Sequence, residues 1–345
     1  MEIVKATNGF PWAWKAGRVE KLIRSILEDK ARRQLNVDRV MIINPTWLHE
    51  SNLTADIQEA NPDFIICHNF VDPAVPKIFE AVQQSGRPYL ILGNSSQWRL
   101  DFWAMVCDLY FKNYEENDLQ LRADSRRFIC LNRKPHPHRR VLVEKLLPHK
   151  HLGFLSLGLP GTNAITVDTT FTDDQGINDE YQYLGTDEGT VSRQIRNDIF
   201  SLGDMNNWNR ALLCIVTETE FNNPVKENFF ISEKTFKPII GMRPFMVYGQ
   251  PRLRDYLKRQ GFDIFEDIFD YTIVDERAHD PVQYQQYAQV AIDAITKLQD
   301  PLATWRDMFY RLQCNRERFH TYAHEQWTKL DELDLQQYIS NTHLE

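Results

Sequence analysis

Cysteine is scarce in this sequence and shows no paired spacing. The 345 residues contain five cysteines, which are odd in number and lie far apart: Cys67, Cys107, Cys130, Cys214 and Cys314. None of them forms a Cys-x-x-Cys motif. This pattern argues against a disulfide framework and indicates reduced thiols in a cytosol-like compartment.

Long apolar runs and an excess of positive charge are also missing. No stretch approaches the length of a membrane span, and segment 1–21 lacks the uninterrupted apolar core of a signal peptide. The formal net charge of -8 does not suggest a nucleic-acid or anionic-membrane partner, although a local basic groove is compatible with it. We therefore expect a cytoplasmic protein without a membrane span.

Apolar and aromatic residues, in contrast, are plentiful. Hydrophobic residues make up 42% of the chain and aromatic residues 12%, which is ample for large cores and argues for a globular protein. A chain of 345 residues exceeds what one hydrophobic core usually organises, so we expect two domains.

The first third of the chain alternates short apolar runs with amphipathic segments. The runs 40–44, 64–69 and 89–94 predict buried parallel strands, and segments 52–60 and 73–86 predict the crossover helices between them. This alternation is typical of a doubly wound α/β domain. We expect a further strand at 102–111 and a domain linker at 112–127.

The alternation restarts after the expected linker. Apolar runs predict strands at 128–132, 151–158, 211–218 and 271–276, and helices dominate from residue 282 onward. The polar segment 160–190 has poor periodicity and reads as a loop. The expected fold is α/β, with a Rossmann-like domain at 1–122, a second Rossmann-like domain at 123–300 and C-terminal helices at 301–345, which we expect to cross back to the first domain.

Basic residues follow the strand at 128–132. In an open α/β sheet, ligands bind beyond the carboxyl ends of the strands, and the next helix offers its positive end to an anion. Five polar residues occupy this position and predict a diphosphate site: Asn132, Arg133, Lys134, Arg139 and Arg140. The alternative is a solvated basic turn in which Arg139 or Arg140 pairs with acidic side chains. His136 and His138 form an isolated His-x-His, and we expect no metal there.

The segment FFISEKTFKPIIGMRPFMVYG, residues 229–249, carries a second candidate site. Ser232 is a good N-cap, so Glu233 and Lys234 fall in the first helical turn, with backbone N–H groups available to a ligand. Glu233 suits the helix dipole there, whereas Lys234 is disfavoured unless an anion lies close by. We therefore predict that Glu233 accepts hydrogen bonds from ribose and that Lys234 meets phosphate. The alternative is a capped surface helix with both side chains solvated.

These two segments resemble the donor-binding region of α1,3-fucosyltransferases. Phe230 matches the family's aromatic position, Glu233 and Lys234 match its acidic and basic pair, and Arg139, or alternatively Arg140, matches the arginine that contacts the nucleotide diphosphate. The same motifs resemble uncharacterised glycosyltransferase-like proteins of phages, large viruses and bacteria. The likeness covers roughly residues 126–300. It departs from the family's Phe-Glu-Asn run, where this chain has VTETEFNN, so that Glu218 or Glu220 would take that role.

The resemblance implies a glycosyltransferase of GT-B type, in which two Rossmann-like domains face a cleft. It implies an inverting transfer from a nucleotide-diphosphate sugar to an acceptor hydroxyl, with no cofactor besides this donor. The sequence contains no Asp-x-Asp pair for a metal, and side-chain cations would stabilise the leaving diphosphate instead. The general base is expected after first-domain strands, with Asp72 favoured over Glu50, His68 and His49.

Two other functions remain compatible with the sequence. One is a phage enzyme of DNA modification that glycosylates hydroxymethylated bases, in which case the protein would act in the host cytoplasm. The other is a non-catalytic module that binds a nucleotide or a sugar. The acceptor is accordingly a glycan, a small molecule or modified DNA.

Overall fold

The structure is a computed structural model that describes residues 1–6, 14–43, 50–69, 76–93, 98–111, 113–132, 136–157, 201–219, 221, 231–250, 252–278 and 280–339. The chain forms two compact units with parallel sheets. Unit 1 includes Met1–Val106 and Ala323–Glu345, and unit 2 includes Cys107–Asn222 and Ile231–Tyr322. Unit 1 gives way to unit 2 after Val106, which lies before the domain boundary expected at residue 122. Helix α11 contributes residues to both units.

Unit 1 is built on a five-stranded parallel sheet in the order β1-β2-β3-β4-β5. The strands follow one another in sequence: β1 (Glu2–Ala6), β2 (Arg39–Ile43), β3 (Phe64–Asn69), β4 (Tyr89–Gly93) and β5 (Trp98–Arg99). The predicted strands at 40–44, 64–69 and 89–94 are confirmed as β2, β3 and β4. Strands β1 and β5 were not predicted from the sequence.

Both faces of this sheet are buried, which explains why its strands are continuous apolar runs. Successive side chains of a strand point to opposite faces. In β2, Met41 and Ile43 belong to a core cluster with Leu53 and Ile57 of helix α2 (Glu50–Ala60). The intervening side chains of β2 are also buried, on the other face.

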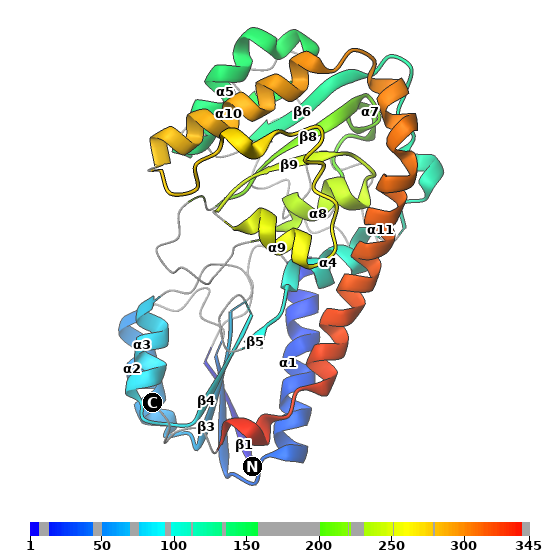
Figure 1. Cartoon of the computed structure of the whole chain (residues 1–345). Helices are drawn as coiled ribbons and strands as arrows, with labels where there is room; N and C mark the ends of the chain where they lie inside the picture. Colours follow the sequence, from blue (N-terminus) through cyan, green and yellow to red (C-terminus); the bar gives the residue numbers. More distant parts are fainter. Residues whose placement is uncertain are drawn as a thin grey trace. The chain divides into compact units, whose positions relative to one another are not determined.

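Helices cover the two faces of the unit 1 sheet. Helices α2 and α3 (Pro76–Gln84) lie side by side over one face, and α1 (Trp14–Gln34) lies on the other (Figure 1). The end of α11 (Pro301–Glu332) is tied to α1, because the Lys30 ammonium donates to the carbonyl oxygens of Asp331 and Leu333. The short helix η6 (Leu335–Tyr338) follows.

Unit 2 contains a four-stranded parallel sheet in the order β7-β6-β8-β9. Its strands are β6 (Arg126–Asn132), β7 (Gly153–Leu157), β8 (Ala211–Thr217) and β9 (Phe245–Tyr248). The chain runs from β6 outward to β7 and then returns to the other side of β6 as β8. The adjacent carboxyl ends of β6 and β8 therefore form a topological switch point, which is where open α/β sheets bind ligands.

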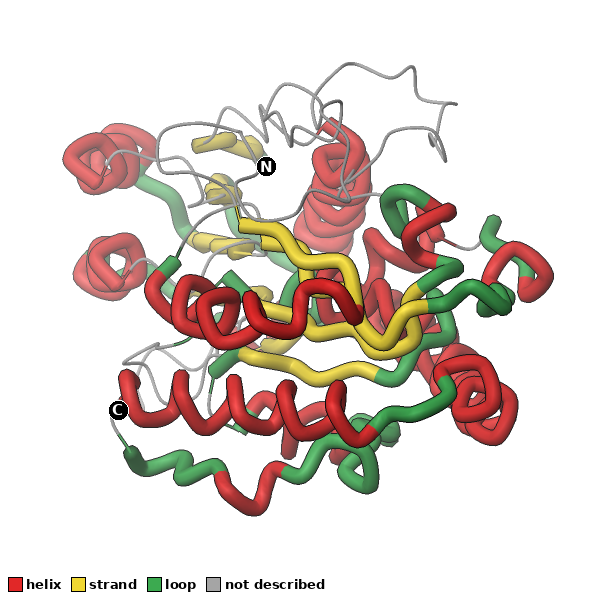
Figure 2. Tube along the Cα trace, turned by 90° about the horizontal axis from the view of Figure 1, so that it is seen from above, coloured by secondary structure: helices red, strands yellow, loops and turns green. Residues whose placement is uncertain are grey.

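The helices of unit 2 also lie on both faces of its sheet. Helix α5 (Pro137–Leu146) follows β6 and packs with α10 (Asp280–Lys297) on one face, and α8 (Glu233–Ile240) follows β8 and contacts β8 and β9 from the other (Figure 1). Figure 2 shows the strands between helical layers. The remaining elements are η2 (Glu116–Leu119), η3 (Leu147–Leu152), α7 (Met205–Trp208), α9 (Leu253–Arg259) and η5 (Tyr271–Ile273). No described helix is long and apolar enough to cross a membrane.

Three expectations about local structure are wrong. Segment 102–111 is helix α4 (Phe102–Phe111) and not a strand. The prediction failed because this helix is buried on most sides, so its sequence lacks the amphipathic period that identifies a helix. Segment 271–276 contains the short helix η5, capped by the Asp270 carboxylate, in place of a strand. The expected domain linker at 112–127 belongs to unit 2 in its described part, residues 113–127, which forms η2 and buries Tyr114, Leu119 and Leu121.

A buried arginine that the sequence analysis did not single out ties the amino end of this sheet together. Arg243 lies between α8 and β9, and its guanidinium donates to the carbonyl oxygens of Leu119 (2.8 Å), Ala211 (2.9 Å), Met242 (2.9 Å) and Trp208 (3.3 Å). Burial lowers its pKa to about 10. Arg243 thus fixes the start of β8 against the end of α8, the two elements whose opposite ends form the candidate site.

Candidate functional site

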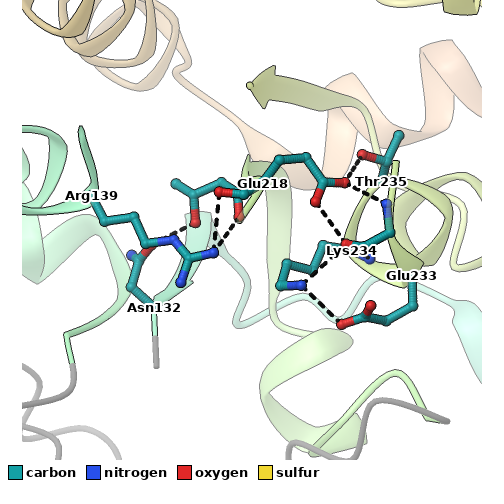
Figure 3. A network of polar contacts seen from close by, with 8 residues as sticks. Asn132, Arg139, Glu218, Glu233, Lys234 and Thr235 are labelled. Atoms are coloured by element: carbon teal, nitrogen blue, oxygen red, sulfur yellow. Dashed lines mark hydrogen bonds and ion pairs between the residues drawn. The ribbon is translucent and has the colours of Figure 1, made fainter. Parts of the chain in front are cut away.

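The candidate site lies at the carboxyl edge of the unit 2 sheet, where β6 and β8 end next to each other. Asn132 is the last residue of β6, and Glu218 directly follows β8. Helix α5 supplies Arg139, and the first turn of α8 supplies Glu233 and Lys234. Figure 3 shows that Glu218 lies between Arg139 on one side and Thr235 and Lys234 on the other. The structure therefore brings together residues that are about a hundred positions apart in the chain.

Asn132 is fully buried and is bonded to its own sheet. Its Nδ2 donates to the carbonyl oxygen of Ser156 in β7 at 3.2 Å and to Cys130 Sγ at 3.3 Å. Its Oδ1 accepts the hydroxyl proton of Thr217 in β8 at 2.6 Å. The side chain thus clamps three neighbouring strands, and its predicted contact with a donor nucleotide would require these bonds to be exchanged.

Arg139 is buried, and its guanidinium reaches the end of β8. Its Nη2 donates to the carbonyl oxygens of Thr217 at 3.2 Å and Glu218 at 3.1 Å. The alternative of a solvated basic turn is therefore wrong for Arg139. Its buried guanidinium donates to the backbone carbonyl groups at the end of β8. Arg140, its neighbour on α5, is exposed.

His138 occupies the same junction from α5. Its Nε2 lies 2.9 Å from the carbonyl oxygen of Glu218, which can only accept, so Nε2 carries the proton. The ring packs against Phe221, Tyr248 and Tyr284, and burial lowers the pKa of His138 to about 3. His138 is therefore a neutral structural donor. The described residues contain no cluster of His, Cys, Asp and Glu that could hold a metal ion.

Glu218 forms hydrogen bonds with residues on both sides of the site. Its carboxylate accepts from the Ser232 N–H (3.0 Å), the Ser232 hydroxyl (2.7 Å) and the Thr235 hydroxyl (2.5 Å). The residue is 0% exposed. Its side chain fastens the start of α8, while its backbone carbonyl is held by His138 and Arg139. Thr235 was missed by the sequence analysis, although it directly follows the Ser-Glu-Lys triplet.

The start of α8 confirms the predicted N-cap, but its backbone N–H groups are not all available to a ligand. Ser232 is the N-cap, and its hydroxyl oxygen accepts from the Lys234 N–H at 3.3 Å. The Thr235 N–H donates to the carbonyl oxygen of Ser232 at 3.2 Å. The expectation that the Lys234 N–H faces a ligand is therefore wrong, because the N-cap hydroxyl takes this donor. Any anion at this position would meet the side chain of Lys234.

Glu233 and Lys234 form an ion pair at the start of α8. Glu233 Oε1 lies 3.2 Å from Lys234 Nζ, and the carboxylate side chain is 5% exposed whereas the lysine side chain is 33% exposed. Burial raises the pKa of Glu233, but the charges of Lys234 and Lys237 and hydrogen bonds from Lys234 and the backbone lower it, so that the pKa lies below its ordinary value. Glu233 is thus an ionised, buried carboxylate. The alternative in which both side chains are merely solvated does not fit this burial.

The candidates for the general base lie in unit 1. His68, near the end of β3, is fully buried, its Nε2 is 3.8 Å from Glu20 Oε1, and burial lowers its pKa to about 3. An acceptor hydroxyl cannot reach a side chain that is closed to solvent, so His68 suits this role least. Glu50 is the first residue of α2. Asp72 and His49 lie outside the described residues.

Other predicted donor contacts also lie outside the described residues. These are Arg133, Lys134, Phe230 and the alternative acidic residue Glu220. Their assignments remain predictions from the sequence.

Comparison of the chain with protein-family models, with curated proteins and with solved structures found no match in any of the three.

Proposed function

We propose that the protein is a glycosyltransferase that transfers a sugar from a nucleotide-diphosphate sugar to an acceptor hydroxyl. The donor would bind to unit 2 at the carboxyl edge of its sheet, and the acceptor would approach from unit 1 in a GT-B-like arrangement. The proposal includes an inverting reaction that needs no metal ion.

The observation that carries this proposal is the position of Lys234. Its ammonium group is partly exposed in the first turn of a helix, next to a topological switch point, and is held by Glu233 Oε1 at 3.2 Å and Ser232 Oγ at 3.1 Å. A cation in the first helical turn is disfavoured by the helix dipole, and a bound anion removes this penalty. A diphosphate is the anion that switch points of this fold commonly hold.

Each site residue has a role that follows from its contacts. Lys234 would meet the diphosphate, and Glu233 would accept hydrogen bonds from the ribose hydroxyls, since an ionised carboxylate only accepts. Arg139 and Glu218 would fix the geometry of the site, because their polar groups bond within the protein. The base would be Asp72 or Glu50.

The reaction itself follows from the charges. A base removes the proton of the acceptor hydroxyl while its oxygen forms a bond to the anomeric carbon. The bond from this carbon to the diphosphate breaks, and the electron pair leaves with the diphosphate oxygen. The ammonium of Lys234 would stabilise the negative charge that develops there.

A thermal-shift screen against nucleoside diphosphates and nucleotide sugars tests the proposal. A ligand at about a hundredfold its dissociation constant stabilises a protein by about 2.7 kcal/mol, so we expect a clear shift with at least one nucleotide sugar. The shift should persist in EDTA and should be lost in Glu233→Gln and Lys234→Met. Transfer of the sugar to acceptors, including hydroxymethylated DNA, is then measured with the donor that binds.

A matched pair of control variants is available in the same unit. Lys258 Nζ and Glu266 Oε2 form an ion pair at 2.8 Å on the surface, so Lys258→Met and Glu266→Gln remove the same charges away from the site. These variants should keep the ligand shift. Equal shifts in all four variants would refute the site, and binding without any turnover would favour the non-catalytic module.

A further inference from the structure

The Ser232 hydroxyl links the buried Glu218 carboxylate to the exposed end of Lys234. Its oxygen lies 2.7 Å from Glu218 Oε2, 3.3 Å from the Lys234 backbone nitrogen and 3.1 Å from Lys234 Nζ. Both groups of Lys234 are donors, whereas the Glu218 carboxylate oxygen is an acceptor for the Ser232 hydroxyl. The single hydroxyl proton must therefore point to Glu218, and the oxygen lone pairs face Lys234.

From this geometry we infer that Glu218 is a positioning residue: through Ser232 it holds the Lys234 ammonium where the diphosphate of the proposed donor would bind. The inference rests on the proposed function for the identity of the anion. It reassigns Glu218, which the sequence analysis treated as a direct contact of the donor.

The burial of Glu218 supports a role through other residues. Its carboxylate is closed to solvent and accepts from three protein donors on α8, so a ribose could reach it only by displacing the start of that helix. The bond from the Ser232 hydroxyl to Glu218 Oε2 is 2.7 Å long, within the usual range for two oxygen atoms. This bond therefore fixes the direction of the Ser232 hydroxyl.

Glu218→Gln keeps the shape of the side chain, but its amide carries N–H donors as well as an acceptor, so the bonds to the start of α8 change. Where the amide nitrogen faces Ser232, it competes with Lys234 for the hydroxyl oxygen. In the other orientation it faces the Ser232 N–H and the Thr235 hydroxyl, and the cap itself is weakened.

Binding of inorganic pyrophosphate, measured by calorimetry, provides the first test. We expect Glu218→Gln and Lys234→Met each to weaken binding by about tenfold, as loss of one charge-assisted contact would. The double variant should be no weaker than Lys234→Met alone, because Glu218 acts through that lysine. Additive losses, or unchanged affinity in Glu218→Gln, would overturn the inference. If Glu218→Gln does not fold, Ser232→Ala takes its place with the same expectations.

A control variant accounts for the loss of a cap as such. The Asp204 carboxylate caps α7 by accepting from the Asn206 N–H at 2.9 Å, and α7 precedes β8, at the opposite edge of the sheet. Asp204→Ala removes this cap and should leave the affinity for pyrophosphate unchanged. A decrease equal to that of Glu218→Gln would show that capping in general, and not the bond to Ser232, sets the affinity.

A second measurement needs no ligand and separates this inference from the proposed function. The side-chain ammonium of Lys234 can be followed by NMR and assigned by the loss of its signal in Lys234→Met. Its protons should exchange with water faster in Glu218→Gln than in the wild type. If no anion binds the wild type, the proposed function fails, while this exchange still decides whether Glu218 positions Lys234. Unchanged exchange would refute the positioning role.

Discussion

The indole Nε1–H of Trp208 donates to the carbonyl oxygen of Gly241 at 3.1 Å, and the ring covers the glycine so closely that a Cβ atom there would lie 2.3 Å from it. Trp208 ends α7, and Gly241 is the C-cap of α8. The absence of a side chain at residue 241 therefore allows the end of α8 to pack against Trp208 of α7.

Gly241→Ala should destabilise unit 2. The added methyl group has no space beside the rigid indole, and overpacking of this kind costs about 1–3 kcal/mol. Urea denaturation measures the change in the free energy of unfolding. In a Trp208→Leu background the same substitution should cost less, because the obstacle is gone. An equal cost in both backgrounds would show that the clash with Trp208 is not the cause.

Arg243→Met should be among the most destabilising substitutions in unit 2. The side chain keeps much of its apolar volume, but buried carbonyl groups of Leu119, Ala211 and Trp208 lose their donor. Each buried group that is left without a partner costs about 1–3 kcal/mol, so the total should be at least about 3 kcal/mol. Denaturation at neutral pH checks this. The control is Arg259→Met on the exposed end of α9, which should change stability little.

His138→Gln should make the free energy of unfolding of unit 2 depend less on pH in the acidic range. The pKa of His138 is lowered from 6.5 to about 3 by burial, so the unfolded chain binds its proton first. The neutral histidine thus contributes stability that is fully present above pH 6.5 and is lost as the pH falls toward 3. Glutamine keeps an N–H donor for the Glu218 carbonyl group but does not titrate.

The measurement is the slope of the unfolding free energy against pH. Between the two pKa values the slope in His138→Gln should be smaller by about one proton. Identical slopes in the wild type and the variant would contradict a neutral, buried His138.

Thr217→Val should cost stability and leave the donor affinity unchanged. Valine has the shape of threonine but cannot donate to Asn132 Oδ1, which now receives the hydroxyl proton at 2.6 Å. A buried acceptor left unsatisfied costs about 1–3 kcal/mol. Denaturation and the thermal-shift screen are compared on the same protein. Loss of ligand binding without loss of stability would mean that Asn132 contacts the ligand directly.

Much of the fold was readable from the sequence because buried parallel strands are short apolar runs between amphipathic helices. This pattern gave β2, β3, β4, β6, β7 and β8. It failed for α4, which is buried on most sides and therefore has no helical period to detect. It also failed for η5, where β-branched residues favour a strand in isolation but the Asp270 cap starts a short helix.

Some features of the candidate site could also be predicted from the sequence. Local rules place Ser232 as the N-cap of α8 and mark Lys234 as a cation in a position that favours an anion, since both statements depend only on neighbouring residues. They also place Asn132 and Glu218 at strand ends, because hydrophobicity defines where the strands stop.

The hydrogen-bond partners of these residues depend on tertiary packing. It buries Glu218 between the Ser232 and Thr235 hydroxyls, turns Arg139 onto the carbonyl groups of β8, and leaves Lys234 at the surface. These partners come from elements distant in the chain, and which donor meets which acceptor depends on how β6, β8 and α8 pack. Local residue patterns thus predicted most strands and the N-cap of α8, whereas the packing of distant elements buries Glu218 and Glu233 and leaves Lys234 partly exposed.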